Sequence, residues 1–208
     1  MDIHLIKDIL VNEAPRLVLQ HIALIFISLF LSIVISVPMG IIFTRTKRKN
    51  IAEAVLNVFG IFQSIPSFAF IAIAMPLLGL GFLPAITALT VQSLLPILRG
   101  TMSGIIAVDK NIIEAARGMG MSKNRIIFEV ELPLALPSII NGVKISAIYN
   151  TSAATLAGFI GAGGLGVLIS KGLSVFTNEY IFVGATLGAL IAIILDTLLD
   201  KLETRIAI

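Results

Sequence analysis

Long apolar segments separated by short polar stretches make up most of the 208-residue chain. The hydrocarbon core of a bilayer is about 30 Å thick and requires roughly 20 apolar residues per helix. Five segments meet this requirement, at about residues 22–43, 55–80, 84–106, 139–160 and 180–199. The pattern therefore predicts an all-α integral membrane protein with five spans.

The first twenty residues have a different pattern. Ile3, Ile6, Leu10 and Leu17 recur at near-helical spacing, and charged residues occupy the positions between them, which is typical of an amphipathic helix. A secretory signal peptide is excluded, because a basic start, a short apolar core and a small-residue cleavage site do not follow one another here. We expect an interfacial helix over residues 1–20 and a five-span domain over residues 21–208.

Polar residues lie at mid-depth in the second, third and fourth spans. Unpaired polar groups are unfavourable there unless they face protein or water, and Pro66 predicts a kink because it lacks an N–H donor. Two interpretations stay open for these side chains, a polar pathway or hydrogen bonds between helices. The aromatic rings among them either face a cation or simply pack. The candidate pathway residues are Gln63, Ser64, Phe68, Gln92, Tyr149, Asn150 and Thr151.

Composition narrows the class of protein. With 57% hydrophobic and 13% charged residues and a mean hydropathy of +1.04, the chain lies outside the range of soluble domains. The absence of cysteine excludes disulfides, thiolate metal sites and cysteine nucleophiles. His4 and His21 have no partner ligands at metal-binding spacing, so we expect surface or interface positions for both.

The basic residues predict an orientation in the membrane. By the positive-inside rule, the cluster after the first span lies in the cytoplasm, so the N-terminus lies outside and the C-terminus inside. The residues expected inside are Arg45, Lys47, Arg48, Lys49, Lys110, Arg117, Lys123, Arg125, Lys201 and Arg205, against Lys7, Arg16 and Lys171 outside. The charge asymmetry supports five spans.

A polar loop at about residues 107–138 interrupts the apolar pattern. Asn111 and Glu114 are spaced as a capping box at a helix start, and Gly120 is placed to follow that helix's end. Ser122 can cap a second short helix, which we expect Pro133 to end. The loop therefore predicts two short helices joined by a glycine turn on the cytoplasmic side.

This loop resembles the EAA signature of permease subunits in bacterial ABC importers. The signature reads EAA, three residues, Gly, nine residues, an aliphatic residue, one residue and Leu-Pro. Glu114-Ala115-Ala116, Gly120, Val130, Leu132 and Pro133 follow this spacing. Val130 stands where Ile is commoner. Residues 62–81, 94–101 and 159–166 are similar to permeases of osmoprotectant importers, which move glycine betaine, carnitine or choline.

The resemblance implies a fold, partners and a coupling site. It implies the five-span transmembrane domain of type I ABC importers, of the kind found in methionine permeases, in a bacterial cell membrane. Two cytoplasmic ATPase subunits, a second permease (a copy or a paralogue) and a separate extracytoplasmic solute-binding protein are the implied partners, in contact with lipid and without nucleic acid. This chain would bind no cofactor, with ATP and Mg on the ATPase. The implied coupling residues are Glu114, Ala115, Ala116, Arg117, Gly118, Gly120, Val130, Leu132 and Pro133.

Other classes of protein fit less well. A Walker motif is absent from the sequence, so hydrolysis belongs to a partner. A secondary transporter would be expected to carry a mid-span carboxylate or inverted repeats, and a membrane enzyme would need clustered acidic or histidine residues. The sequence shows none of these features. A methionine-type or other amino-acid importer is the nearest rival.

A glycine pattern between the last two spans imitates the dinucleotide-binding fingerprint. Gly161, Gly163, Gly164 and Gly166 read G-x-G-x-x-G, but a preceding strand and a suitably placed acidic residue are missing. We reject a Rossmann fold. These glycines either form a gate-like bend or allow close helix packing.

Overall fold

A computed structural model describes residues 1–46 and 49–206, and within these ranges every regular element is a helix. Lys47 and Arg48 of the basic cluster lie outside the described residues. The elements in chain order are α1 (Ile3–Asp8), η1 (Ile9–Glu13), α2 (Ala14–Arg45), α3 (Lys49–Ser64), α4 (Ser67–Leu78), α5 (Phe82–Ile106), α6 (Lys110–Gly118), α7 (Lys123–Ile126), η2 (Ile127–Glu131), α8 (Leu132–Ala157), η3 (Gly158–Ile160), α9 (Gly166–Ser174) and α10 (Asn178–Ile206).

The first three elements form one uninterrupted helix from Ile3 to Arg45. The helix expected over residues 1–20 is thus continuous with the first span. Ile9 and Leu17 are buried against α9 and α10, which extends the packed part of the helix well before the first apolar run. Pro15 falls just after the π-helical turn η1. That wider turn accommodates a residue that has no N–H and whose ring would clash with the preceding turn.

The expected kink at Pro66 is a bend of 101° between α3 and α4. Pro66 precedes the first residue of α4 and has the extended conformation that ends the α3 helix. Within the described residues, four helices are long and apolar enough to cross a membrane, or five when the bent pair counts as one span. The expected five spans correspond to the second count.

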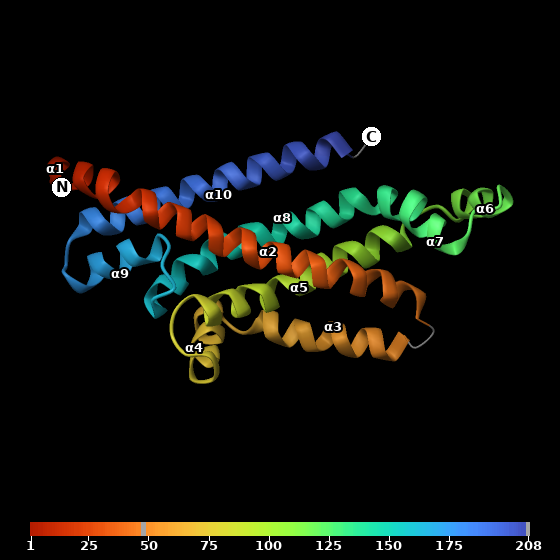
Figure 1. Cartoon of the computed structure of the whole chain (residues 1–208), viewed down its shortest axis with the longest axis horizontal. Helices are drawn as coiled ribbons and strands as arrows, with labels where there is room; N and C mark the ends of the chain where they lie inside the picture. The colour runs from red at the N-terminus through yellow and green to blue at the C-terminus, as the bar shows by residue number, and fades with distance from the viewer. Residues whose placement is uncertain (47–48, 207–208) are drawn as a thin grey trace.

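Helix α5 lies at the centre of the bundle, between α2 and α8 (Figure 1). Small residues at every fourth position of α2, namely Ser28, Ser32, Ser36 and Gly40, are buried on the side that meets α5. The Ser32 and Ser36 hydroxyls donate hydrogen bonds to the α5 carbonyls of Thr90 and Leu94, each at 3.0 Å. Small side chains allow this close approach, which is the usual basis of helix association in membranes.

The crossing of α5 and α8 depends on glycine. A Cβ atom added to Gly100 would lie 2.5 Å from the Ser138 carbonyl oxygen, and one added to Gly142 would lie 2.6 Å from the Pro96 carbonyl oxygen. Gly104, one turn beyond Gly100, is also crowded, since a Cβ atom there would lie 2.9 Å from the Ala135 carbonyl oxygen. The two backbones are therefore in direct contact.

The two ends of the bundle carry different elements (Figure 1). The N-terminus, α9 and the segment 161–166 lie at one end, which we call the glycine end. Helices α6 and α7 project from the other, which we call the loop end, and α10 runs from the glycine end toward it. Most of α10 is exposed and apolar, as at Leu190, Ile193 and Leu198, which suits a helix surrounded by lipid.

Candidate functional site

Helix α6 begins at Lys110, two residues earlier than the sequence predicted. Asp109 is its N-cap, and the Asp109 carboxylate accepts a hydrogen bond from the Asn111 backbone N–H at 2.9 Å. The predicted Asn111 cap is therefore wrong, because Asn111 already lies inside the helix. Asp and Asn are both good N-caps, and Asp109, which comes first in the chain, caps the helix.

The glycine turn after α6 is confirmed in detail. Gly120 has φ of +80°, a conformation that side chains disfavour. Its N–H donates to the Arg117 carbonyl at 2.9 Å, and the Met121 N–H donates to the Ala116 carbonyl at 3.1 Å. This pair of bonds is a Schellman motif, which satisfies carbonyls left free at the helix end. Ser122 then caps α7 as predicted, accepting from the Arg125 N–H.

The second short helix does not end at Pro133. Helices α7, η2, α8 and η3 form one continuous helix from Lys123 to Ile160. Val130 and Leu132 are half-buried along it, and Pro133 is exposed near the start of α8. The π-helical turn η2 directly precedes Pro133, as η1 precedes Pro15, and it accommodates the proline without a break. The loop is thus continuous with a span.

Helix α6, which carries the EAA residues, turns most of them outward. Glu114, Ala115, Arg117 and Gly118 are exposed, whereas Ala116 is 2% exposed. Helix α6 packs mainly against α7 and η2, and it projects beyond the rest of the bundle (Figure 1). A short helix held by so little of its own chain, with small and charged residues turned outward, is suited to seat against another protein.

An ion pair joins the loop to the first helix. Arg45, the last residue of α2, pairs with Glu131, whose carboxylate is almost fully buried at the end of η2. Sequence reasoning missed this pair, since 86 positions separate the two residues and no local spacing indicates it.

Three polar residues at mid-depth, Ser28, Ser93 and Asn150, bind one another. The Ser93 hydroxyl donates to Asn150 Oδ1, and Asn150 Nδ2 donates to Ser28 Oγ, both at 2.8 Å. Asn150 is fully buried and so joins α2, α5 and α8. Thr151, also buried, donates to the Ala147 carbonyl within α8. These contacts favour the helix-packing interpretation for Asn150. The Thr151 bond stays within α8, and Thr151 lines a cavity of about 340 Å³ together with residues of α9 and α10.

The bend between α3 and α4 has its own polar support. Gln92 is buried and donates from Nε2 to the Ile65 carbonyl at 3.2 Å, which the break in the helix leaves free. The Tyr149 and Ser67 hydroxyls are 2.7 Å apart. Phe68 is exposed on α4 and meets Phe159 edge to face, with ring centroids 6.1 Å apart.

One of the cavities that have a predicted pathway residue in their lining has a volume of about 630 Å³. Gln63 lines it from α3, together with polar groups that the sequence interpretation had not selected for the pathway: Arg99, Ser103, Ser138 and Asn141. The cavity lies between α3, α5 and α8. Ser64 is exposed beside it at the end of α3, and its hydroxyl donates to the Ile61 carbonyl.

The glycine-rich segment packs tightly against α2 and α8. A Cβ atom on Gly166 would lie 1.7 Å from the Thr155 carbonyl oxygen, and one on Gly163 would lie 2.4 Å from Gln20 Oε1. Gly161, with φ of +77°, has open space around it. Close packing thus explains Gly166 and Gly163, and a turn explains Gly161. No strand precedes the segment in the described chain; the 3₁₀ turn η3 does.

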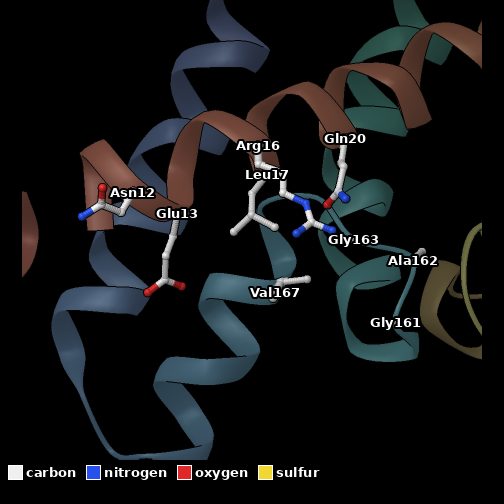
Figure 2. Close-up of a pocket in the computed structure, with 9 residues that line it drawn as sticks. All are labelled: Asn12, Glu13, Arg16, Leu17, Gln20, Gly161, Ala162, Gly163 and Val167. Atoms are coloured by element: carbon white, nitrogen blue, oxygen red, sulfur yellow. The ribbon is translucent and has the colours of Figure 1, made fainter. Parts of the chain in front are cut away.

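Figure 2 shows a cavity of about 430 Å³ where this segment faces the start of α2. The guanidinium of Arg16 and the amide of Gln20 point into it, and Gln20 Oε1 accepts from the Gly164 N–H at 3.2 Å. Glu13 also lines this cavity, and the Lys171 ammonium donates to both of its carboxylate oxygens, at 2.8 and 2.9 Å. That carboxylate raises the pKa of Lys171 above its ordinary value, with a smaller contribution from Tyr180.

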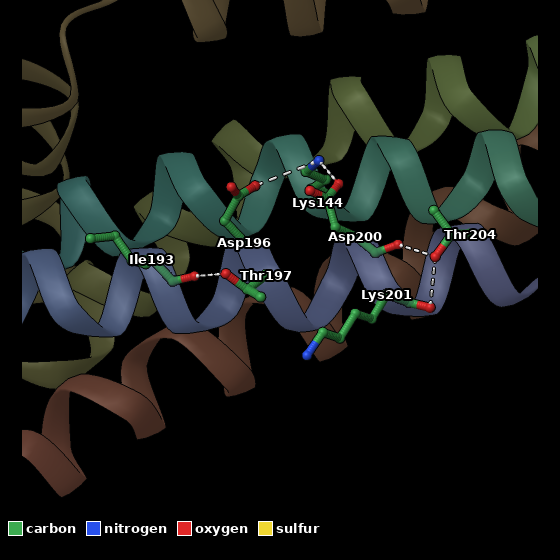
Figure 3. Close-up of polar contacts among 7 residues, drawn as sticks. All are labelled: Lys144, Ile193, Asp196, Thr197, Asp200, Lys201 and Thr204. Atoms are coloured by element: carbon green, nitrogen blue, oxygen red, sulfur yellow. Dashed lines mark hydrogen bonds and ion pairs between the residues drawn. The ribbon is translucent and has the colours of Figure 1, made fainter.

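A second ionic group ties α8 to α10 (Figure 3). The Lys144 ammonium pairs with Asp200 and lies 3.5 Å from Asp196. The Lys144 ammonium therefore has two carboxylates of α10 as neighbours. The pair neutralises charge between two helices, where lipid would otherwise make it unfavourable.

Comparison with known proteins gives concordant matches. A family profile described as "Binding-protein-dependent transport system inner membrane component" matches residues 36–208. The chain is 42% identical over 187 residues to the carnitine transport permease protein OpuCB of Listeria monocytogenes, covering 90% of this chain and 85% of that one. It is 44% identical, with the same coverage, to the glycine betaine/carnitine/choline transport system permease protein OpuCB of Bacillus subtilis. It is 41% identical to the osmoprotectant import permease protein OsmY of Salmonella typhimurium, covering 90% and 80% of the two chains.

Among solved structures, an inward-facing form of the MetNI methionine ABC transporter matches with a TM-score of 0.84 and 24% identity over 99% of both chains. At this identity the likeness concerns the fold. It confirms the expected all-helical, methionine-permease type of transmembrane domain.

Proposed function

Because the chain belongs to the family of inner membrane components of binding-protein-dependent transport systems, we propose that it is the permease of an importer of quaternary ammonium osmoprotectants. Glycine betaine, carnitine and choline are the proposed solutes. The resemblance drawn from the EAA loop is confirmed at the level of the family. A permease of this family is not an enzyme, and ATP and Mg belong to the partner ATPase.

The observation that carries the coupling role is the exposed α6 helix at the loop end. It presents Glu114, Ala115 and Arg117 and ends in the Gly120 turn. We assign the whole motif, including Gly118, Val130, Leu132 and Pro133, to the docking of an ATPase. Val130, Leu132 and Pro133 belong to the continuous helix from Lys123 to Ile160, which would carry a displacement of the loop into α8.

The proposed orientation places the loop end in the cytoplasm and the glycine end outside. Basic residues support it, since those of α6 and α7 lie at the loop end and Lys7, Arg16 and Lys171 lie toward the other. Two ATPases, a second permease and an outer solute-binding protein complete the proposed importer.

For the pathway, the cavity lined by Gln63 and Arg99 is our first choice. The aromatic rings of Phe68 and Tyr149, on α4 and α8, are the proposed faces for a quaternary ammonium. The glycines at 161, 163, 164 and 166 form a tight outer turn, whose rigidity would serve a gate as well as packing.

Co-purification tests the function. We expect an ATPase and a solute-binding protein to elute with the tagged chain, and loaded binding protein to stimulate ATP hydrolysis. Glu114→Ala and Gly120→Val should abolish this stimulation, whereas Glu53→Ala, which removes an exposed carboxylate from α3, should preserve it. Wild-type stimulation by the two loop variants would exclude the docking role.

Solute identity needs a separate measurement. Titration of the co-purified binding protein with glycine betaine, carnitine, choline and methionine should give binding only with the quaternary ammonium compounds. Methionine binding alone would favour the rival amino-acid importer.

A further inference from the structure

A basic cavity of about 370 Å³ lies at the loop end, enclosed by the end of α2, α6, α7 and η2. We call it the basic cavity. The residues that line it are Arg45, Ile113, Arg117, Lys123, Asn124, Ile126, Ile127 and Glu131. Side chains from α6, α7 and η2 thus meet the last residue of α2 at this cavity.

The charges in the basic cavity are not balanced. Its single carboxylate, Glu131, is 1% exposed and is already paired with Arg45. Among the described residues, no carboxylate forms an ion pair with Arg117 or Lys123. Two cationic groups are therefore left facing one cavity beside a third that is neutralised.

The surroundings strengthen any interaction with these cations. Ile113, Ile126 and Ile127 form an apolar side of the cavity, and Ile126 is 4% exposed. Electrostatic attraction is stronger next to such low-dielectric walls than in open water. An anionic group that entered the cavity would relieve the repulsion between the cations.

We propose that the basic cavity receives an acidic side chain, Asp or Glu, of the ATPase subunit. This inference rests on the proposed function and deepens it. Arg117 offers a planar guanidinium that matches both oxygens of a carboxylate, and Lys123 offers a point charge.

A protein occupant fits better than a free anion because the charged cavity adjoins exposed apolar surface. On α6 and at its end, Ile112 is 44% exposed and Met119 is 77% exposed. A protein surface covers both the apolar residues and the cations, whereas an inorganic anion or a lipid headgroup satisfies the cations alone.

The first test measures how tightly the co-purifying ATPase binds the permease in nanodiscs. Arg117→Gln and Lys123→Gln should each weaken binding about tenfold, because each removes a charge-assisted contact at a partly buried interface. Both should also reduce the dependence of binding on salt. Lys110→Gln, which removes the same charge from the exposed start of α6 outside the cavity, should change binding less than twofold. An equal effect of all three variants would overturn the proposal.

The second test identifies the occupant. A water-soluble carbodiimide condenses a carboxylate with a lysine amine to an amide, with hydration of the reagent to a urea. We expect mass spectrometry to find Lys123 joined to an Asp or Glu of the ATPase. Lys123→Arg should abolish this cross-link while retaining tight binding, because arginine keeps the charge but does not form the amide.

The outcomes separate this inference from the proposed function. Failure of any ATPase to co-purify would remove both. An ATPase that binds the Arg117→Gln and Lys123→Gln variants normally, and cross-links only through other lysines, would overturn the basic cavity alone. Reduced binding of anionic lipid vesicles in those variants, with normal ATPase binding, would assign the cavity to a headgroup instead.

Discussion

The contact between α5 and α8 makes Gly142→Ala a demanding test of the fold. The added methyl carbon would lie 2.6 Å from the Pro96 carbonyl oxygen and 3.0 Å from the Ile97 Cα atom. Both are backbone atoms, so no side-chain rotation can relieve the contact. The first distance is about 0.8 Å less than the 3.4 Å at which ordinary contact begins, and the helices must separate by a comparable amount.

Two opposing terms set the size of the effect. Overpacking of this kind destabilises a protein by about 1–3 kcal/mol, whereas Ala is more favourable than Gly inside a helix by about 0.5–1 kcal/mol. With the middle of each range, the net loss is about 1 kcal/mol. For a chain of this size each kcal/mol corresponds to about 2–4 °C in Tm, so we expect Tm to fall by about 2–4 °C.

A matched substitution isolates the packing term. Gly60 lies within α3, and a Cβ atom there would meet nothing within 4 Å. Gly60→Ala carries the same helix preference without overpacking and should raise Tm by about 1–4 °C. Retention of a monodisperse peak in size-exclusion chromatography, after heating in detergent, measures both variants. Equal shifts in the same direction would refute the close crossing.

Three further variants test the polar contacts. Arg45→Gln leaves the Glu131 carboxylate buried without its partner and should lower the free energy of unfolding by about 1–3 kcal/mol. Adding Glu131→Gln should recover most of this loss. A double variant whose loss equals the sum of the losses of the two single variants would contradict the pairing. Asn150→Leu should lower Tm but leave the ratio of solutes taken up unchanged, and a changed ratio would place Asn150 in the pathway. Because the pKa of Lys171 is raised in the folded protein, its ion pair stabilises the fold at every pH below the ordinary lysine pKa, and this stabilisation is lost as pH rises through the raised value. The free energy of unfolding of Lys171→Met should therefore vary less with pH above about pH 10 than that of the wild type.

Much of the fold was predictable because bilayer thickness is a strong constraint on sequence. Apolar run lengths gave the spans, Pro66 gave the bend, and Gly120 with Ser122 gave the turn of the EAA loop. The Asn111 cap was wrong because Asp109 is also a good cap and lies two residues earlier, so the pattern alone does not choose between them.

Other features depend on geometry that spacing does not reveal. Pro133 usually predicts a helix end, but a π-helical turn can absorb a proline when tertiary packing holds the helix on both sides. The Arg45–Glu131 pair joins distant segments and has no local pattern. By contrast, the small residues at 28, 32, 36 and 40 and the Gly100–Gly104 pair were visible at four-residue spacing. They would have indicated which helices pack on α5.

The continuous helix from Lys123 to Ile160 has a mechanical consequence. At 1.5 Å per residue its 38 residues extend about 57 Å, so it acts as a lever arm whose short end carries the EAA loop. A tilt of about 5° would displace the far end by about 5 Å over that length. The wider turn at η2 separates the loop from the long part of the arm, so the stiffness of that turn controls how much of a push at the loop reaches the glycine end.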